Sequence, residues 1–508
     1  AEGGGNVFGL EFDSDGRLFS GHNGGGTRGW HYLQGCYLLK QGRTPNKYGP
    51  PANPYAFGDL AMMRSANEIV RFSHNTILCE GTAGPTRMQG HFLAADPIHH
   101  FLVLSERRKR GSTFETQDLG HPLQSTDPAF RPVYLCNAPD GSIYVADFYD
   151  FYIAHGQHYQ SQIDPSTGRV YRVRGKGNEL EKKIRLSGLK GDELVELLAH
   201  PNKWHRMTAV RLLGQRAGEQ ELRERLKLWI RSHDGIAALH GLWALHQAGG
   251  VGREVARELL RHPYPPVRAW MVRLLGDPGS CSREMEQALV LHAGAETDPE
   301  VWSQLASTAQ RLGNGVGLRL VAPLLERCGE LDDPNLPLML WWAIEKHCEE
   351  HSAEVVQLME NRTIWEQVMV RREILPRLMR RFAMTGREAD LLVCAQLLKL
   401  APGAGSPLTL TVDRHSRIPT MHFPWHRRGQ TPQRTRRPRA RSPVSAGARR
   451  SGATGPATPR ATRPPPLRPA VSRGRRSVDR PAKTYVTAAG YQDWPGQTSA
   501  RPAAPRRQ

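Results

Sequence analysis

The sequence predicts a partial β-propeller, followed by an α-helical solenoid of HEAT repeats and a disordered basic tail. Three observations lead to this fold class. Short strand-like segments joined by tight turns fill residues 1–175, and near Leu180 an apolar period of 3.6 residues replaces a period of two. A proline-rich stretch almost without acidic residues closes the chain. We assign 176–190 to a linker, 191–400 to the solenoid and 401–508 to the tail.

The clearest strand pattern lies between Asp127 and Arg174. Two segments with alternating apolar residues flank Pro139-Asp140-Gly141, and Gly168–Val173 reads as a third strand. Proline fixes φ, aspartate bonds its own backbone and glycine accepts a positive φ, so the tripeptide indicates a tight turn. Short strands joined in this way are typical of a propeller blade.

The same hairpin pattern occurs near the start of the chain, where Val7–Phe12 and Arg17–Ser20 flank Asp13-Ser14-Asp15-Gly16. Further short strands are expected in 71–80 and 92–106, the latter interrupted by Asp96-Pro97. A blade takes roughly 40–50 residues, so residues 1–175 hold about three to four blades, and a propeller usually has four to eight. We therefore expect an incomplete propeller and a chain that is a fragment.

The helical part contains an internal repeat. HPNKWHRMTAVRLLG at 200–214 and HPYPPVRAWMVRLLG at 262–276 are identical at eight of fifteen positions. Their offset of 62 residues equals two units of about 31, a period typical of paired-helix solenoids. The repeated leucines, Leu212, Leu213, Leu274 and Leu275, are predicted to be buried between neighbouring units.

The basic charge of the chain resides in the tail. Residues 407–508 contain 21 Arg, one Lys, three Asp and no Glu, a net charge of +19 out of +20 for the whole chain. The part before the tail is almost neutral, so its composition does not favour nucleic-acid binding, and any such binding would be non-specific and confined to the tail. Either a genuine basic tail or a frameshifted reading of a GC-rich gene would give this composition.

The seven cysteines are widely spaced and form no C-x-x-C pair, so we expect free thiols and find no haem-attachment motif. No run of 18 apolar residues and no signal peptide is present. No P-loop, Rossmann fingerprint or Ser-His-Asp spacing appears either. The motifs of the common nucleotide-dependent enzymes and hydrolases are therefore absent from the sequence.

The segments FRPV, PDGSIYVAD and GRVYRV, together with GNVFGLEF, GHNGG and TRGWHY upstream, resemble the quinoprotein glucose/sorbosone dehydrogenase group. The similarity is to its large "membrane-bound dehydrogenase" proteins, which join a six-bladed propeller to HEAT repeats and usually to a c-type haem domain. It covers about 1–175 for the propeller and continues to roughly residue 400.

The resemblance implies a fragment of a dehydrogenase that oxidises a sugar or alcohol and passes electrons to a cytochrome c-type domain or protein. It implies pyrroloquinoline quinone and calcium as cofactors, and an exported, periplasmic or membrane-associated location. The catalytic His of these enzymes lies in an earlier blade, so no catalytic residue is identified and the chain alone is expected to be inactive. The alternative is a non-catalytic propeller and HEAT scaffold for protein or glycan partners, with protein partners bound through the solenoid.

Two candidate site residues lie around the central hairpin. Arg131 matches an arginine that reaches the quinone carboxylates in the related dehydrogenases, and a guanidinium suits a carboxylate because it pairs with both oxygens. The alternative is an arginine that ties a loop to the neighbouring blade. Asp147, at the end of the strand Ile143–Ala146, either holds a ligand or accepts loop amides.

The remaining candidates are near the start of the chain. His22, Asn23, Gly24 and Gly25 match a glycine-rich loop beside the cofactor and calcium, although Gly26 and Thr27 stand where the dehydrogenases carry acidic residues. The alternative is a plain strand connection. Asn6 matches one half of an Arg-Asn pair next to the quinone, with Gly5 in place of the arginine. No metal ligand is assigned.

Limited digestion with trypsin tests the predicted tail. Cleavage should begin beyond about Ser406, because arginine is dense there and little apolar surface is available for packing. Mass spectrometry of the early fragments would show this. Early cleavage within 191–400 with an intact tail would contradict the prediction.

Overall fold

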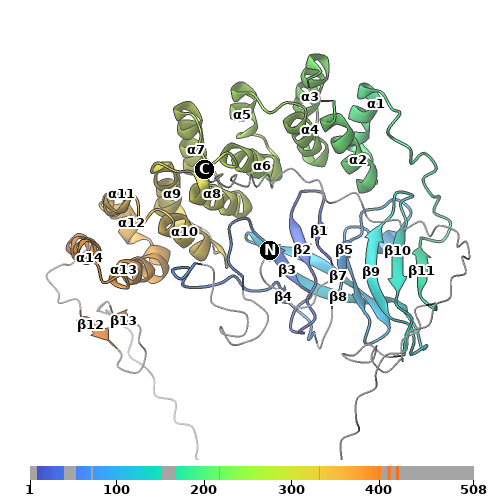
Figure 1. The fold of residues 1–508 in the computed structure, drawn as a ribbon, viewed down its shortest axis with the longest axis horizontal. Coiled ribbons are helices and arrows are strands. Elements are labelled where there is room, and N and C mark those ends of the chain that lie inside the picture. Colours follow the sequence, from blue (N-terminus) through green and yellow to red (C-terminus); the bar gives the residue numbers. More distant parts are fainter. Residues whose placement is uncertain are drawn as a thin grey trace, which may run out of the picture. The chain divides into compact units, whose positions relative to one another are not determined.

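The computed structural model describes residues 9–38, 53–69, 73–151, 166–216, 218–330, 332–401, 409–412 and 419–422 (Figure 1). Strands come first, between residues 11 and 173, and helices follow between 191 and 400. The predicted order of a β part followed by a helical part is therefore confirmed.

Three sheets make up the β part. Their strands are β1 (Glu11–Phe12), β2 (Leu18–Ser20), β3 (Trp30–Tyr32), β4 (Arg64–Ser65), β5 (Thr76–Leu78), β6 (Phe92–Asp96), β7 (Phe101–Arg110), β8 (Thr113–Gln124), β9 (Pro132–Asn137), β10 (Ile143–Asp147) and β11 (Arg169–Val173). The sheet orders are β1-β2-β3, β4-β8-β7-β6-β5 and β11-β10-β9. All neighbours are antiparallel except β4 and β8.

The five-stranded sheet is the middle layer of three. Successive residues of a strand point to opposite faces, and two buried clusters use that alternation. Ile77 and Leu93 pack with Leu135 and Val145 of the β9–β11 sheet. On the other face of the same strands, Leu78 and Phe92 pack with Phe19 of β2. Each sheet thus covers the apolar face of the next.

The helical part contains α1 (Gly191–Glu196), α2 (Lys203–Gly214), α3 (Gln220–Ser232), α4 (Gly235–Gln247), α5 (Arg253–Leu259), α6 (Pro265–Gly276), α7 (Arg283–Ala295), α8 (Pro299–Arg311), α9 (Val316–Arg327), α10 (Leu336–Glu345), α11 (Ser352–Leu358), α12 (Arg362–Glu366), α13 (Leu375–Ala383) and α14 (Glu388–Leu400). Among the described residues, no helix combines the length and the hydropathy that a membrane span needs.

The helices form two layers. Helices α2, α4, α6, α8 and α10 contact one another in sequence, and the series α1 with α3, α5 with α7 and α7 with α9 makes a second row. Figure 1 shows the pairs following one another in chain order from α1 to α14, with the sheets beside the first row. We call α2, α4, α6, α8 and α10 the inner helices.

The repeated leucines are not equally buried, in contrast to the prediction. Leu213 is fully buried and Leu212 nearly so, whereas Leu274 and Leu275 at the same positions of α6 are only half-buried. The neighbours differ, since α1 and the turn 197–199 pack closely on α2, whereas α5 makes much less contact with α6. The same leucine pair in the two copies is therefore not buried to the same extent.

The sequence pattern missed one large element. The long hairpin of β7 and β8 turns at Gly111-Ser112, although the strand prediction ended at residue 106 and β8 was not predicted. Within the stretch predicted to be disordered, β12 (Thr409–Val412) and β13 (Pro419–His422) pair antiparallel. The described strands do not close into a ring of blades.

Replacing Leu213 by Ala should destabilise the chain by about 2–5 kcal/mol, because its fully buried side chain would leave a cavity. The matched change Leu275→Ala should cost clearly less, since that side chain is only partly buried. Urea unfolding followed by circular dichroism measures both. Equal losses of stability in the two variants would contradict the assigned burial.

Candidate functional site

The turn Asp13–Arg17 between β1 and β2 is bonded extensively to other parts of the chain. Asp13 organises it, because one carboxylate oxygen accepts the backbone N–H groups of Asp15 at 3.0 Å and Arg17 at 2.9 Å. Gly16 completes the turn with a φ of +78°. The Asp-Gly turn predicted from sequence is thus present, and its side-chain bonds hold it rigid.

The inner helices bind the exposed backbone of this turn. The indole N–H of Trp270, on α6, donates to the carbonyl oxygen of Asp15 at 2.8 Å. Nε2 of His240, on α4, lies 2.8 Å from the carbonyl oxygen of Ser14. Arg206, on α2, donates to the Ser14 hydroxyl at 2.5 Å. Three successive inner helices therefore hold one loop.

Only glycine fits at the tip of the turn. A Cβ atom on Gly16 would lie 2.5 Å from the ring of Trp270 and 2.9 Å from that of Trp243, closer than real Cβ contacts allow. The two indoles pack edge to face, with ring centroids 5.0 Å apart. Gly16 is therefore required both for its positive φ and for this close approach.

Buried ion pairs surround the turn. The Asp13 carboxylate is completely buried and lies 3.1 Å from Arg17 and 2.6 Å from Arg107 of β7. Burial alone would raise the pKa of Asp13, but Arg17 and then Arg107 outweigh it and hold this pKa below its usual range. Arg17 continues to Glu300, on α8, through two hydrogen bonds of 2.5 and 3.0 Å.

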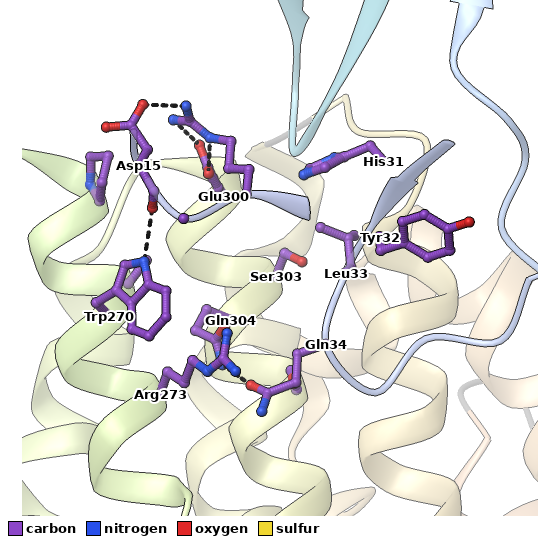
Figure 2. A pocket seen from close by; sticks show the side chains of 15 residues that line it. Asp15, His31, Tyr32, Leu33, Gln34, Trp270, Arg273, Glu300, Ser303 and Gln304 are labelled. Carbon is purple, nitrogen blue, oxygen red and sulfur yellow. Dashed lines mark hydrogen bonds and ion pairs between the residues drawn. The ribbon is translucent and has the colours of Figure 1, made fainter. Parts of the chain in front are cut away.

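A small cavity lies beside this network (Figure 2). His31 and Gln34 line it from the β part, and Trp270 and Gln304 line it from α6 and α8. Gln304 donates to Gln34 at 2.9 Å across it. Its volume of about 70 Å³ holds a few water molecules, whereas small-molecule sites usually measure about 300–1,000 Å³.

Two titratable groups, one lining the cavity and one next to it, have pKa values shifted away from neutral pH. Burial, and next the charge of Arg17, lowers the pKa of His31 to about 3, so its imidazole is neutral. Burial, and next Asp15, raises the pKa of Tyr264, whose hydroxyl donates to Asp15 at 2.5 Å. Neither group is therefore suited to proton transfer near neutral pH, and Tyr264 instead holds the turn through Asp15.

Other turns of the β part bind further along the inner helices. The Ser112 hydroxyl, at the tip of the β7–β8 hairpin, donates to Asp333 just before α10 at 2.9 Å. The indoles of Trp341 and Trp342, on α10, donate to the carbonyl oxygen of Ala56 at 3.0 and 2.8 Å. The row of inner helices is thus lined by the chain's own loops.

The side chain of Arg131, the predicted quinone ligand, donates its hydrogen bonds to backbone carbonyl oxygens. Its guanidinium donates to four carbonyl oxygens, those of Pro97, Ile98, Asp150 and Phe151, at 2.8–3.2 Å. These bonds use four of the five N–H groups of the side chain, which is 8% exposed. This geometry corresponds to the alternative role stated above, in which Arg131 holds a loop in place.

Asp147 lies next to Arg131, and its carboxylate also bonds to backbone groups. One carboxylate oxygen accepts the backbone N–H groups of Arg131 at 2.7 Å and Tyr149 at 2.9 Å, and the other accepts the Tyr171 hydroxyl at 3.1 Å. Its oxygens hold the bulge at the end of β10. The structure therefore brings together two of the predicted residues, Arg131 and Asp147.

The loop of His22, Asn23, Gly24 and Gly25 lies elsewhere, paired with Ser73 through His22. His22 packs edge to face on Trp30, and burial lowers its pKa. Its Nδ1 is buried, with no hydrogen-bond partner among the described residues. Within the described part of the chain, no hydrogen bond or ion pair joins this loop to Arg131. Asn6 lies outside the described residues.

The residues that hold the turn have no signature in the sequence. His240, Trp270 and Glu300 act from helices more than 200 positions away, and only the Asp-Gly turn itself was visible in the sequence. No metal ligand was predicted either. Among the described residues, one group brings three potential metal ligands together, namely Glu181, His200 and His205.

Residues 1–177 match a family model described as "Domain of unknown function (DUF7133)". No curated protein matches the chain. Among solved structures, two designed armadillo repeat proteins, one of them in complex with the peptide (KR)4, match at 13% and 15% identity. Each match covers 42% of this chain and 100% of the other, with a TM-score of 0.24. An engineered protein matches at 16% identity, covering 42% and 98%, with a TM-score of 0.22. Such low TM-scores carry no argument about fold.

A double-mutant cycle of Arg17→Gln and Glu300→Gln should give a coupling energy of about 1–3 kcal/mol in chemical unfolding. Both side chains are only 13% exposed, so either single change leaves a largely buried charge without one of its partners.

The pair Arg231 and Glu258 is the matched control, because it has similar geometry but both side chains are more than 40% exposed. Its coupling energy should be about 0–1 kcal/mol. A coupling energy between Arg17 and Glu300 no larger than that of the control would show that the buried network does not hold the turn to α8.

Proposed function

We propose that the three sheets are blades of an incomplete propeller of the six-bladed type, and that the helices are HEAT repeats. The sheets support this proposal because they are small meanders, antiparallel apart from the β4–β8 pair, and each covers the apolar face of the next. The helices support it because they form two layers with an internal offset of 62 residues.

We further propose that this pair is a non-catalytic scaffold for protein or glycan partners. The observation that carries the proposal is the state of Arg131. An arginine that binds a quinone carboxylate needs two adjacent N–H groups free, whereas four of its five donate to backbone carbonyls. The small cavity beside Asp13–Arg17 offers no room for a quinone or a sugar.

The β part already covers one face of the helices, so a partner must bind another surface. The inner helices, the face that solenoids commonly use for binding, hold the turns of the β part. A cleft of about 700 Å³ remains open between β10, β11 and residues 177–184. Arg172, Lys182 and Tyr144 line it, a mixture of charge and aromatic surface that suits a polar partner.

A fragment of a quinone-dependent sugar or alcohol dehydrogenase is the second candidate, with a cytochrome c-type electron acceptor and an exported location. It rests on the resemblance of the blade segments. One structural feature favours it, namely the loop around His22. Gly25 and Gly26 there have φ values of +76°, and the buried Nδ1 of His22 lacks a hydrogen-bond partner. Such a loop allows a ligand to approach backbone closely.

Replacing Arg131 by Gln separates the two functions. If Arg131 has only a structural role, the change should lower the stability by about 2–4 kcal/mol, because buried carbonyl oxygens lose their donors. Neither the parent nor the variant should then show quinone-dependent dye reduction with any sugar. Urea unfolding and a dye-reduction assay with pyrroloquinoline quinone, calcium and a sugar panel measure the two quantities.

Arg169→Gln is the control, because Arg169 is an exposed cation of the same region that stacks on Tyr149. It should leave the stability within about 0.5 kcal/mol of the parent. Sugar-dependent dye reduction in the parent that Arg131→Gln removes, with stability unchanged, would instead establish the dehydrogenase.

A further inference from the structure

We propose that Glu181, His200 and His205 form a binding site for a zinc-class divalent cation where the β part joins the first helices. One potential ligand atom from each residue lies within 4.8 Å of the others. Tetrahedral zinc has ligands about 2.0–2.2 Å away, so its ligand atoms are roughly 3.4 Å apart. Each of the three must therefore move inward by less than about 1 Å. The inference is independent of the proposed scaffold function.

His205, in the first turn of α2, is the strongest part of the site. It is 3% exposed, and its Nε2 lies 3.3 Å from the carbonyl oxygen of Pro139, which places the ring proton on Nε2. Nδ1 then carries a bare lone pair, and it is buried without a hydrogen-bond partner. Metal-bound histidines have this arrangement, in which one nitrogen donates to a carbonyl and the other binds the cation.

His200 supplies the second imidazole. Its ring stacks on that of His205 with centroids 4.3 Å apart, and its Nε2 lies 3.8 Å from Glu181. In the metal-free arrangement its Nδ1 accepts the backbone N–H of Asn202 at 3.1 Å, so the proton lies on Nε2. Metal binding through Nε2 requires the tautomer with the proton on Nδ1. Nδ1 then no longer accepts the Asn202 N–H, a small loss beside coordination of the cation.

Comparison with the second copy of the repeat shows which features of His200 and His205 belong to every repeat and which occur only at the proposed metal site. His262 occupies the position of His200, and its Nδ1 likewise accepts a backbone N–H, that of Tyr264 at 3.1 Å. This bond is therefore a feature of the repeat's turn. At the position of His205 the second copy has Val267, which is fully buried. A buried histidine with a bare nitrogen is thus found in the first copy, beside the β part.

Glu181 completes a set of two histidines and one carboxylate. Its backbone N–H donates to the carbonyl oxygen of Asp140 at 3.0 Å, and the Thr82 hydroxyl donates to its carboxylate at 3.1 Å. Glu181 also lines the 700 Å³ cleft, so water can take the fourth position. Two imidazoles and a carboxylate favour zinc or cobalt over calcium or magnesium.

The test is titration of the untagged full chain, first stripped with a chelator, with cobalt as a visible probe and then with zinc. We expect one cobalt per chain with tetrahedral absorption, displaced by zinc, and a zinc-dependent rise in the unfolding temperature. Glu181→Gln and His200→Gln should each weaken cobalt binding by more than about 100-fold, since losing even an outer-shell partner costs about 10–100-fold.

His99→Gln is the control, because His99 forms a separate histidine–carboxylate pair with Asp96 and should leave cobalt binding unchanged. Circular dichroism confirms that each variant is folded, and Glu181→Gln keeps an acceptor for Thr82. The proposal is overturned if the parent shows no stoichiometric cobalt spectrum. It is also overturned if either site variant keeps the parent's affinity, or if His99→Gln loses it.

Discussion

Burial of charge at the turn Asp13–Arg17 is the constraint on which the arrangement of the β part and the helices depends. The Asp13 carboxylate and the Arg17 guanidinium are removed from water, and a buried charge is tolerated only when its partners are complete. Some of those partners lie on β7 and others on α8. The turn can therefore reach its native state only when sheet and helices are assembled around it, which joins the two parts into one cooperative unit.

Much of the fold was predictable because local physics dictates it. The two-residue period and the Asp-Gly turns gave the strands around Pro139-Asp140-Gly141, and the repeated fifteen residues gave α2 and α6. The failures involve long-range packing. Strand β8 carries polar residues that find their partners across the sheet, and Leu274 resembles Leu212 in sequence but has different neighbours. Neither difference is encoded in a short window of sequence.

The candidate sites were harder to predict than the fold. Arg131 and Asp147 lie next to each other, but most of their hydrogen-bond partners are backbone carbonyls and amides, which have no sequence signature. His240 and Trp270 are ordinary apolar-face residues of a helix until the turn is placed against them. The group around His205 did leave a trace, because aligning the two repeats sets a histidine against Val267. A polar residue at a core position of a repeat indicates a buried polar interaction that the other repeats lack.

The packing of Gly16 between Trp243 and Trp270 also bears on how this chain can evolve. Arrays of identical helical units usually gain and lose members by duplication and deletion, because each unit contacts only its neighbours. Here the two indoles come from consecutive inner helices and meet at one glycine of a different region. Removing a unit between α2 and α10 would shift every later helix along the row and separate Glu300 from Arg17 and Asp333 from Ser112. The number of units in this segment is therefore constrained by contacts with the β part, and the constraint extends to α13, where Arg377 donates to the carbonyl oxygen of Phe57.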